Sequence, residues 1–223
     1  MNNRNYQKEL DRLIEDIAGR GVRPRLLIHS CCAPCSSYVM EYLSRYFDLT
    51  MFFYNPNMDS LEEYIKRANE LRRLIDETGM SERIRLVISD YTPEDFESIA
   101  AGHEQDPERG ERCLRCYRLR LEKTASYMQS YNLTHPEEKY DYFATTLTLS
   151  PFKSAEALND IALQLSEQYS VKCLETDFKK RGGYKRSIEL SKEYGLYRQD
   201  YCGCRYSKRA AELRRASKLA MAE

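Results

Sequence analysis

The sequence of 223 residues lacks tryptophan and contains no apolar run long enough to cross a bilayer. Because a membrane-spanning helix needs about 20 predominantly apolar residues, we expect no membrane span. The first residues, MNNRNYQKEL, are polar and charged, so we expect no secretory signal there and a cytoplasmic location. The absence of internal repeats, low-complexity tracts and linkers predicts one domain over residues 1–223.

The sequence also lacks a net charge, because 35 Lys and Arg residues balance 35 Asp and Glu residues. The charges are unevenly placed: residues 179–218 contain 13 Lys or Arg but only 4 Asp or Glu. A basic face on an otherwise acidic protein suits a nucleic-acid partner. A solvated helix face gives the same pattern, so charge alone leaves both interpretations open.

The apolar pattern alternates between strand-like and helix-like segments. Expected strands lie at 25–30, 48–54, 84–89, 140–147 and 171–176. Expected helices lie at 10–17, 34–46, 60–78, 113–131, 187–194 and 205–220, and two more begin near residues 93 and 154. This alternation predicts an α/β protein with a parallel sheet and flanking helices, which binds ligands at the carboxyl ends of its strands. Residues 1–24 then form an N-terminal helical extension and residues 205–223 a basic C-terminal helix.

The chain has 8 cysteines, and seven of them fall in three groups. These groups are HSCCAPC (29–35), ERCLRC (111–116) and DYCGC (200–204). In a reducing cytoplasm, clustered cysteines more often bind metal or do redox work than form structural disulfides. The first group follows the first expected strand, where this fold class places its active site. Cys173 stands apart within an expected strand, and we interpret it as a small core residue.

Spacing alone leaves the role of these thiols open among an iron–sulfur cluster, zinc and disulfides. Seven clustered thiols exceed the four ligands of one tetrahedral zinc, and the adjacent Cys31 and Cys32 are unusual in a zinc site. An iron–sulfur cluster needs four thiolates at a larger radius. The C-x-C pair Cys202 and Cys204 would close a strained, easily reduced disulfide, or supply two further metal ligands.

Six motifs together resemble the epoxyqueuosine reductases of the QueH type. They are HSCCAPC, FYNPN (53–57), GERCLRC (110–116), TTLTLSPFKS (145–154), FKKRGGYKRS (178–187) and LYRQDYCGC (196–204). The resemblance runs from about residue 25 to about residue 207, in the family's order. It implies a Rossmann-like fold of the adenine-nucleotide alpha-hydrolase-like group. It also implies the last step of queuosine synthesis, the cobalamin-independent, two-electron removal of the epoxide oxygen from epoxyqueuosine at the tRNA wobble position.

The resemblance further implies roles for individual cysteines. Cys31, Cys32, Cys113 and Cys116 match the positions that hold a [4Fe-4S] cluster in the family, and Cys202 and Cys204 match its redox-active pair. Family members can carry an additional mononuclear iron, held by cysteine and carboxylate ligands. The third cysteine of the first motif, which can be aspartate in the family, is Cys35 here, so Cys35 is the candidate ligand for that second iron.

The residue chemistry agrees with such a reaction, because deoxygenating an epoxide needs electrons and an acid at the oxygen. A cluster delivers single electrons, and a neighbouring iron would act as the Lewis acid. Cys202 and Cys204 would store an electron pair or ligate the iron, and the sequence does not choose between these roles. Tyr201, Asp200 and His29 are candidate proton donors, although a structural role is the default for His29.

The resemblance also implies a tRNA with a GUN anticodon as the substrate, and we expect an electron donor of the ferredoxin or flavodoxin type. The basic residues around Gly182 and Gly183 are candidates to bind the phosphate backbone: Lys179, Lys180, Arg181, Lys185 and Arg186. Tyr54 or Tyr184 would stack on a nucleobase, with ordinary packing as the alternative interpretation.

Two other functions are compatible with parts of this pattern. An ATP-using tRNA thiolation-type enzyme would need a glycine-rich turn after the first strand, and HSCCAPC has none, so we expect no ATP use. A zinc-stabilised RNA-binding module without catalysis would explain the basic segment and one C-x-x-C pair. It would not explain the adjacent Cys31 and Cys32.

Overall fold

The computed structural model describes residues 4–220 and is built around a parallel sheet. Its strands are β1 (Arg25–His29), β2 (Asp48–Phe53), β3 (Ile84–Ile88) and β4 (Tyr142–Thr145), in the order β3-β2-β1-β4. All three pairings are parallel, with Leu26 opposite both Leu49 and Tyr142. The predicted α/β class with a parallel sheet is confirmed.

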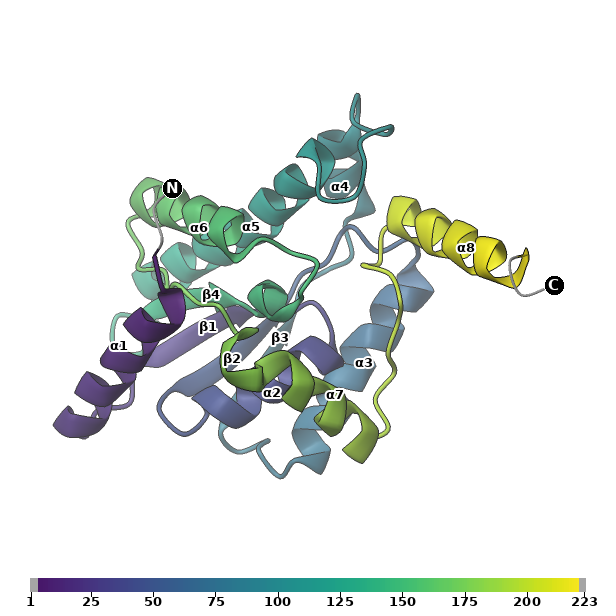
Figure 1. Cartoon of the computed structure of the whole chain (residues 1–223). Coiled ribbons are helices and arrows are strands. Elements are labelled where there is room, and N and C mark those ends of the chain that lie inside the picture. The colour runs from purple at the N-terminus through teal and green to yellow at the C-terminus, as the bar shows by residue number, and fades with distance from the viewer. Residues whose placement is uncertain (1–3, 221–223) are drawn as a thin grey trace.

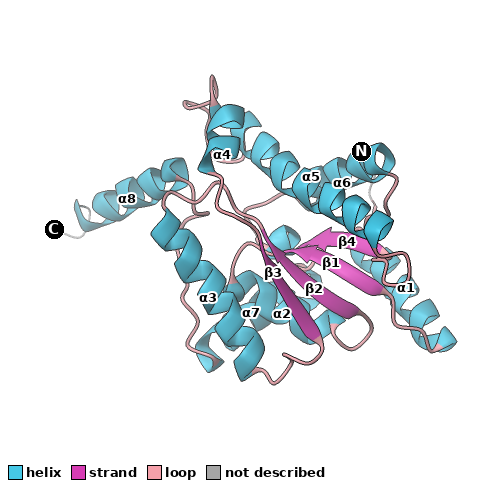
Figure 2. Cartoon of the chain, turned by 180° about the vertical axis from the view of Figure 1, so that it is seen from behind, coloured by secondary structure: helices cyan, strands magenta, loops and turns pink. Residues whose placement is uncertain are grey.

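Helices cover both faces of this sheet (Figures 1 and 2). They are α1 (Tyr6–Arg20), α2 (Ala33–Leu43), α3 (Leu61–Glu77), α4 (Pro93–Ala100), α5 (Glu111–Thr134), α6 (Ala155–Tyr169), α7 (Gly183–Glu193) and α8 (Arg205–Ala220), with short 3-10 helices η1 (Thr146–Leu149) and η2 (Lys180–Gly182). The side chains of α1, α2 and α3 pack on one face, and those of α5 and α6 pack on the other. In the described residues no helix is both long and apolar enough to cross a membrane.

The alternation of side chains along the central strands divides the core in two. Leu26 and Ile28 belong to the cluster under α1, α2 and α3, whereas the intervening Leu27 belongs to the cluster under α5 and α6. Met51 and Phe52 divide in the same way. Strands buried on both faces read as continuous apolar runs, which is why the sequence pattern located them.

Local signals in the sequence place several helix starts. The hydroxyl of Ser60 accepts a hydrogen bond from the backbone N–H of Glu63 at 3.2 Å, as an N-cap does. Pro34 occupies the first turn of α2, where its missing N–H costs nothing. The extended residue before that turn is Cys32, so the chain carries the first cysteine group from the end of β1 directly into α2.

The prediction of a fifth strand at residues 171–176 is wrong. Only one bridge joins it to the sheet, between Phe143 and Cys173. Beyond that bridge, Asn159 of α6 exchanges two hydrogen bonds of 3.0 Å with the backbone of Thr176. An asparagine side chain thus satisfies the backbone groups that a ladder would otherwise have paired.

Two other boundaries also differ from the prediction. β4 ends at Thr145, because the hydroxyl of that residue accepts from the N–H of Leu147 and begins the turn of η1. α7 begins at Gly183 rather than at residue 187. A Cβ at Gly183 would lie 2.1 Å from the carbonyl oxygen of Phe178 and 2.4 Å from the ring of Tyr38, so only glycine fits where α7 packs on α2.

Candidate active site

A cavity of about 860 Å³ lies beyond the carboxyl ends of the strands. Seven of the eight cysteines line it: Cys31, Cys32, Cys35, Cys113, Cys116, Cys202 and Cys204. The three groups that the sequence separates by up to 173 positions therefore meet in one place, as their position in this fold class predicts. All eight cysteines are free thiols.

The first cysteine group forms the tightest cluster of metal-ligating atoms in residues 4–220. The sulfur atoms of Cys31, Cys32 and Cys35 all lie within 4.8 Å of one another, and the first two are 3.8 Å apart. Hydrogen bonds from Cys32 and Cys35 hold the pKa of the Cys31 thiol well below its usual range. The contact with Cys31 in turn raises the pKa of the Cys32 thiol to about 12, and it also raises the pKa of the Cys35 thiol. One shared thiolate among three sulfur atoms is a donor set suited to a cationic metal.

The second group projects from the first two turns of α5, Cys113 from the first and Cys116 from the second. Cys116 is buried, and burial raises the pKa of its thiol to about 12. Cys113 is less buried, and its sulfur accepts a hydrogen bond of 3.3 Å from the backbone N–H of Arg109. Both line the cavity, but neither belongs to the tight triad. The structure thus places Cys35 closer to Cys31 and Cys32 than the predicted partners Cys113 and Cys116 are.

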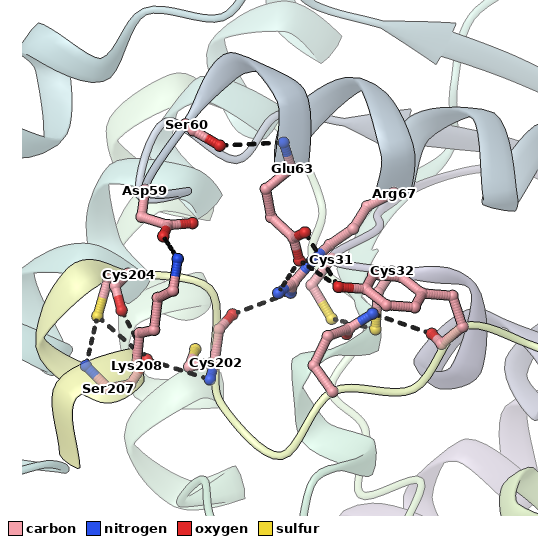
Figure 3. A network of polar contacts seen from close by, with 12 residues as sticks. Cys31, Cys32, Asp59, Ser60, Glu63, Arg67, Cys202, Cys204, Ser207 and Lys208 are labelled. Atoms are coloured by element: carbon pink, nitrogen blue, oxygen red, sulfur yellow. Dashed lines mark hydrogen bonds and ion pairs between the residues drawn. The ribbon is translucent and has the colours of Figure 1, made fainter. Parts of the chain in front are cut away.

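The third group lies where the chain enters α8 (Figure 3). The N–H of Cys202 donates to the hydroxyl of Ser207 at 3.2 Å, and the N–H of Ser207 donates to the sulfur of Cys204 at 3.4 Å. Between the two cysteines, Gly203 adopts a φ of 123°, which a side chain would strain. These contacts fix the backbone of both thiols against the first turn of α8.

Three cationic side chains surround these thiols, and sequence reasoning missed all of them. Arg67 is buried against Glu63 at 2.6 Å and donates to the carbonyl of Cys202 at 3.3 Å (Figure 3). Arg120 and Lys153 line the same cavity. Burial opposes ionisation of Cys202, but the positive charges of Lys153 and Arg120 outweigh it and lower the pKa of that thiol.

Arg120 is the most unusual of these cations, because it is only 1% exposed. Its Nε donates to the carbonyl of Cys116 at 3.2 Å, whereas its Nη2 is buried without a hydrogen-bond partner. In the described part of the chain no carboxylate lies within ion-pair distance of it. The spacing contained a signal: Arg120 follows Cys116 by one helical turn and therefore shares its face.

Two candidate proton donors, Tyr201 and Asp200, line the cavity, but His29 does not. His29 is fully buried, with Nδ1 3.0 Å from the hydroxyl of Thr145 and Nε2 3.1 Å from the carbonyl of Tyr54. Burial lowers the pKa of His29 to about 3, with the charge of Arg120 acting in the same direction. His29 is therefore a neutral residue that joins neighbouring strands, which was the default interpretation.

Of the two tyrosines proposed to stack on a base, one is buried and the other lines the cavity. Tyr54 is 1% exposed and donates its hydroxyl to Asp95 at 2.7 Å, so its prediction as a stacking residue is wrong. Tyr184 lines the cavity and remains available. Cys173 lies outside the cavity and is partly buried against the core under α5 and α6.

None of the predicted phosphate-binding residues lines the cavity: Lys179, Lys180, Arg181, Lys185 and Arg186. Three of the five are paired with carboxylates: Lys179 with Asp177 at 2.9 Å, Arg181 with Asp11 at 2.5 Å and Arg186 with Glu41 at 2.6 Å. Lys180 and Lys185 are exposed. Nothing in these contacts tests RNA binding, which stays a prediction for this segment.

The fold and the cavity together define an α/β protein with a thiol-rich, cation-lined site suited to metal or redox chemistry. A family model described as epoxyqueuosine reductase QueH matches residues 26–210, and the chain belongs to that family. The resemblance seen in the motifs is therefore confirmed.

Several relatives named epoxyqueuosine reductase QueH are similar over most of their length. The protein of Streptococcus pyogenes serotype M1 is 38% identical over 91% of this chain and 78% of its own length. That of Staphylococcus epidermidis is 39% identical over 90% of this chain and 83% of its own. The more distant protein of Thermotoga maritima is 34% identical over 82% and 89%, respectively.

Proposed function

We propose that this protein is an epoxyqueuosine reductase that converts epoxyqueuosine to queuosine at the wobble position of a tRNA with a GUN anticodon. The reaction removes the epoxide oxygen as water and consumes two electrons and two protons. The observation that carries this proposal is the convergence of seven thiols from three distant segments in one cavity of a chain that belongs to the family.

The residues of the cavity fit an iron–sulfur cluster. Cys31, Cys32, Cys113 and Cys116 would hold a [4Fe-4S] cluster, which when bound would supply single electrons at low potential. A cluster with four thiolates is an anion, and the unpartnered Nη2 of the buried Arg120 is a donor that a bound anion would satisfy. The tight grouping of Cys35 with Cys31 and Cys32 supports Cys35 as a ligand of an additional iron.

Cys202 and Cys204 are the source of the electron pair in this proposal. With Cys202 ionised and Cys204 protonated, their oxidation to a disulfide releases two electrons and one proton. The second proton needed to convert the epoxide to an alkene and water would come from the proton donor beside them, Tyr201 or Asp200. An external donor of the ferredoxin or flavodoxin type would then return the pair to the dithiol, without cobalamin or ATP. The lowered pKa of Cys202 favours its thiolate, the form that reacts in thiol–disulfide chemistry.

The remaining residues of the cavity would position the substrate and supply protons. Tyr201 and Asp200 line the cavity on the same segment as Cys202, which supports either as the proton donor to the epoxide oxygen. The ammonium of Lys153, whose pKa the nearby thiols raise in spite of burial, would keep Cys202 ionised between turnovers. The basic residues Lys179–Arg186 would bind phosphates outside the cavity.

The test is purification without oxygen, followed by iron, sulfide and zinc analysis and a turnover assay on tRNA carrying epoxyqueuosine. We expect about four irons and four sulfides, with any additional iron assigned to the Cys35 site, and queuosine among the digested nucleosides. Cys202→Ser should keep its iron yet lose at least about a hundredfold in turnover, whereas the matched variant Cys173→Ser should be unaffected. One zinc without sulfide, and no queuosine, would instead support an RNA-binding zinc protein.

A further inference from the structure

One large aromatic side chain stands exposed at the wall of the cavity. Phe152 lies between η1 and α6, is 63% exposed and lines the cavity. Among the described residues, the other exposed large apolar side chains are Val22, Leu61, Ile65, Leu133 and Leu213, and none of them is aromatic or lines the cavity. Burying a phenyl ring is favourable, so an exposed ring at the wall of a cavity indicates a surface that a partner covers.

Arg109 covers one side of this ring. The carbon at the centre of its guanidinium lies 5.4 Å from the centroid of Phe152. Its backbone has a φ of 74°, an uncommon conformation for an arginine. The next residue, Gly110, keeps the loop tight, because a Cβ there would lie 3.1 Å from the carbonyl of Pro107.

The same loop connects this aromatic surface to the thiols. The backbone N–H of Arg109 donates to the sulfur of Cys113 at 3.3 Å, while its side chain reaches over Phe152. The guanidinium is exposed and, in residues 4–220, forms no ion pair with a carboxylate. A free cation, an exposed aromatic face and a candidate cluster ligand are thus held together at one wall of the cavity.

We propose that Phe152 is a stacking platform for a nucleobase next to the modified nucleotide, and that Arg109 binds the adjoining phosphate. This inference rests on the proposed function, because it requires that an anticodon loop binds in the cavity. Arg109 covers one face of the ring, so the base takes the other. Bases that protrude from single-stranded loops stack on aromatic side chains, whatever their identity, and guanidinium groups bind phosphate.

Stacking on Phe152 would hold a base in place, which phosphate binding alone does not do. The basic residues Lys179, Lys180, Arg181, Lys185 and Arg186 lie outside the cavity and would place the tRNA only by its backbone. A base held against Phe152 fixes the neighbouring nucleotide beside Cys113, and so orients the cyclopentane ring inside the cavity. Base identity is not read by stacking, which suits a substrate class that shares only part of its anticodon.

The experiment uses the full chain and an unmodified anticodon stem-loop RNA with 2-aminopurine placed on either side of the wobble nucleotide. We expect wild-type binding to change the 2-aminopurine fluorescence at one of the two positions. Phe152→Ala should weaken binding about tenfold and abolish that change. Phe152→Tyr should retain both, because it keeps a stacking face. Leu133→Ala, which removes an even more exposed apolar side chain at the far end of α5, is the matched control and should change neither.

Arg109→Gln provides a second, separate measurement. It should weaken binding and reduce its dependence on salt by about one phosphate contact, while the fluorescence change is kept. Wild-type binding and fluorescence in Phe152→Ala would overturn the platform, whatever the outcome of the turnover assay. Conversely, a wild-type protein that gives the fluorescence change but makes no queuosine would overturn the proposed function and leave the platform standing.

Discussion

At the scale of single residues, the charge of Arg120 is what most distinguishes this cavity from an ordinary cluster of cysteines. A guanidinium taken out of water loses its hydration, and a nearby anion must compensate for that loss. In the described chain the groups available to Arg120 are a carbonyl, an amide oxygen 3.5 Å away on Asn55 and the thiols. The protein therefore stores positive charge that a bound anionic group or a thiolate would neutralise.

Replacing Arg120 with Met should therefore shift the reduction potential of the proposed iron–sulfur cluster, once reconstituted, to a more negative value. Reduction adds negative charge, and the loss of a buried cation disfavours the reduced form more than the oxidised one. A spectroelectrochemical titration without oxygen measures the midpoint.

Lys123→Met is the control, because it removes a positive charge from the same helix at an exposed position outside the cavity. Its potential should stay within error of the wild type. Equal midpoints for Arg120→Met and the wild type, at equal iron content, would show that Arg120 does not act on the centre electrostatically.

The sequence predicted the thiols better than the charges around them. Cysteines are rare enough that their spacing indicates a site, and the alternation of strands and helices places the first group at the carboxyl end of a strand. The local pattern did not indicate that Arg67 and Arg120 are buried. Arg67 follows a glutamate by four residues and Arg120 lies on a long charged helix, and both patterns are typical of exposed residues. Tyr54 was misjudged for a similar reason, since its partner Asp95 comes from α4 and pairs with it only after folding.

At the scale of elements, α3 holds the segment that carries Cys202 and Cys204. Glu70 accepts from the N–H of Tyr197 at 2.7 Å and pairs with Arg73 at 2.8 Å. Arg73 in turn donates to the carbonyl of Tyr194 at 3.0 Å. The segment between α7 and α8 contains no regular structure, so these side chains supply hydrogen bonds that a helix or a ladder would otherwise provide.

Glu70→Gln should therefore destabilise the protein by about 1 kcal/mol at pH 7. The bond to Arg73 is the main cause that lowers the pKa of Glu70 below its usual 4.5, so the unfolded state binds more protons near that pH. The contribution is complete above pH 4.5, is lost as the pH falls further and disappears below the folded-state pKa. Urea unfolding between pH 7 and pH 3 should show the difference between wild type and variant shrinking in that window.

The matched variant is Glu77→Gln, which removes the other carboxylate bound to Arg73 but leaves the contact with Tyr197 intact. Glu77 is 43% exposed, so this change should cost no more than about 0.5 kcal/mol. A Glu70→Gln variant as stable as Glu77→Gln at pH 7 would contradict the anchoring role.

The lysines of the basic segment before and within α7 differ in whether they are exposed or hydrogen-bonded within the protein. Lys180 and Lys185 are exposed, whereas Lys179 donates to the carbonyls of Thr148 and Lys153. The double variant Lys180→Glu, Lys185→Glu should weaken binding of the anticodon stem-loop at least about tenfold at low salt and reduce the salt dependence. Filter binding across a salt series checks this, with unchanged affinity at low salt as the refuting result.

The predicted fifth strand shows what the apolar pattern of a single segment cannot reveal, namely a distant side chain that binds its backbone. The segment 171–176 has the apolar composition of a strand, and one bridge to β4 does form there. Its continuation depends on a single asparagine in α6 that bonds the backbone of Thr176. Local sequence cannot reveal such a competitor, because the asparagine lies 17 residues away along the chain.

At the scale of the whole molecule, the cavity is held together by segments that secondary structure alone leaves separate. Its thiols come from the β1–α2 turn, the first turn of α2, the first two turns of α5 and the entry to α8. Its cations Arg67, Arg120 and Lys153 come from α3, α5 and the loop before α6. α8 extends away from the sheet (Figure 1), and its residues 212–218 are exposed. The apolar anchor of this end of the chain is a small cluster of Cys204 with Phe96, Ala100 and Cys116, so a group bound by the thiols of the cavity would add to it.

We therefore expect a bound metal group to act as a covalent tie between these segments. Because folded protein binds the group and unfolded protein does not preserve the site, loading should raise the Tm by about 5 °C or more. Calorimetry without oxygen on the reconstituted and chelator-treated protein measures this, and limited proteolysis of residues 194–204 should slow in parallel. Cys113→Ala should abolish most of the difference, whereas Cys173→Ala, which removes a thiol outside the cavity, should preserve it. Equal Tm values for iron-loaded and iron-free protein would mean that the cavity is already rigid, and that its thiols are positioned by the fold alone.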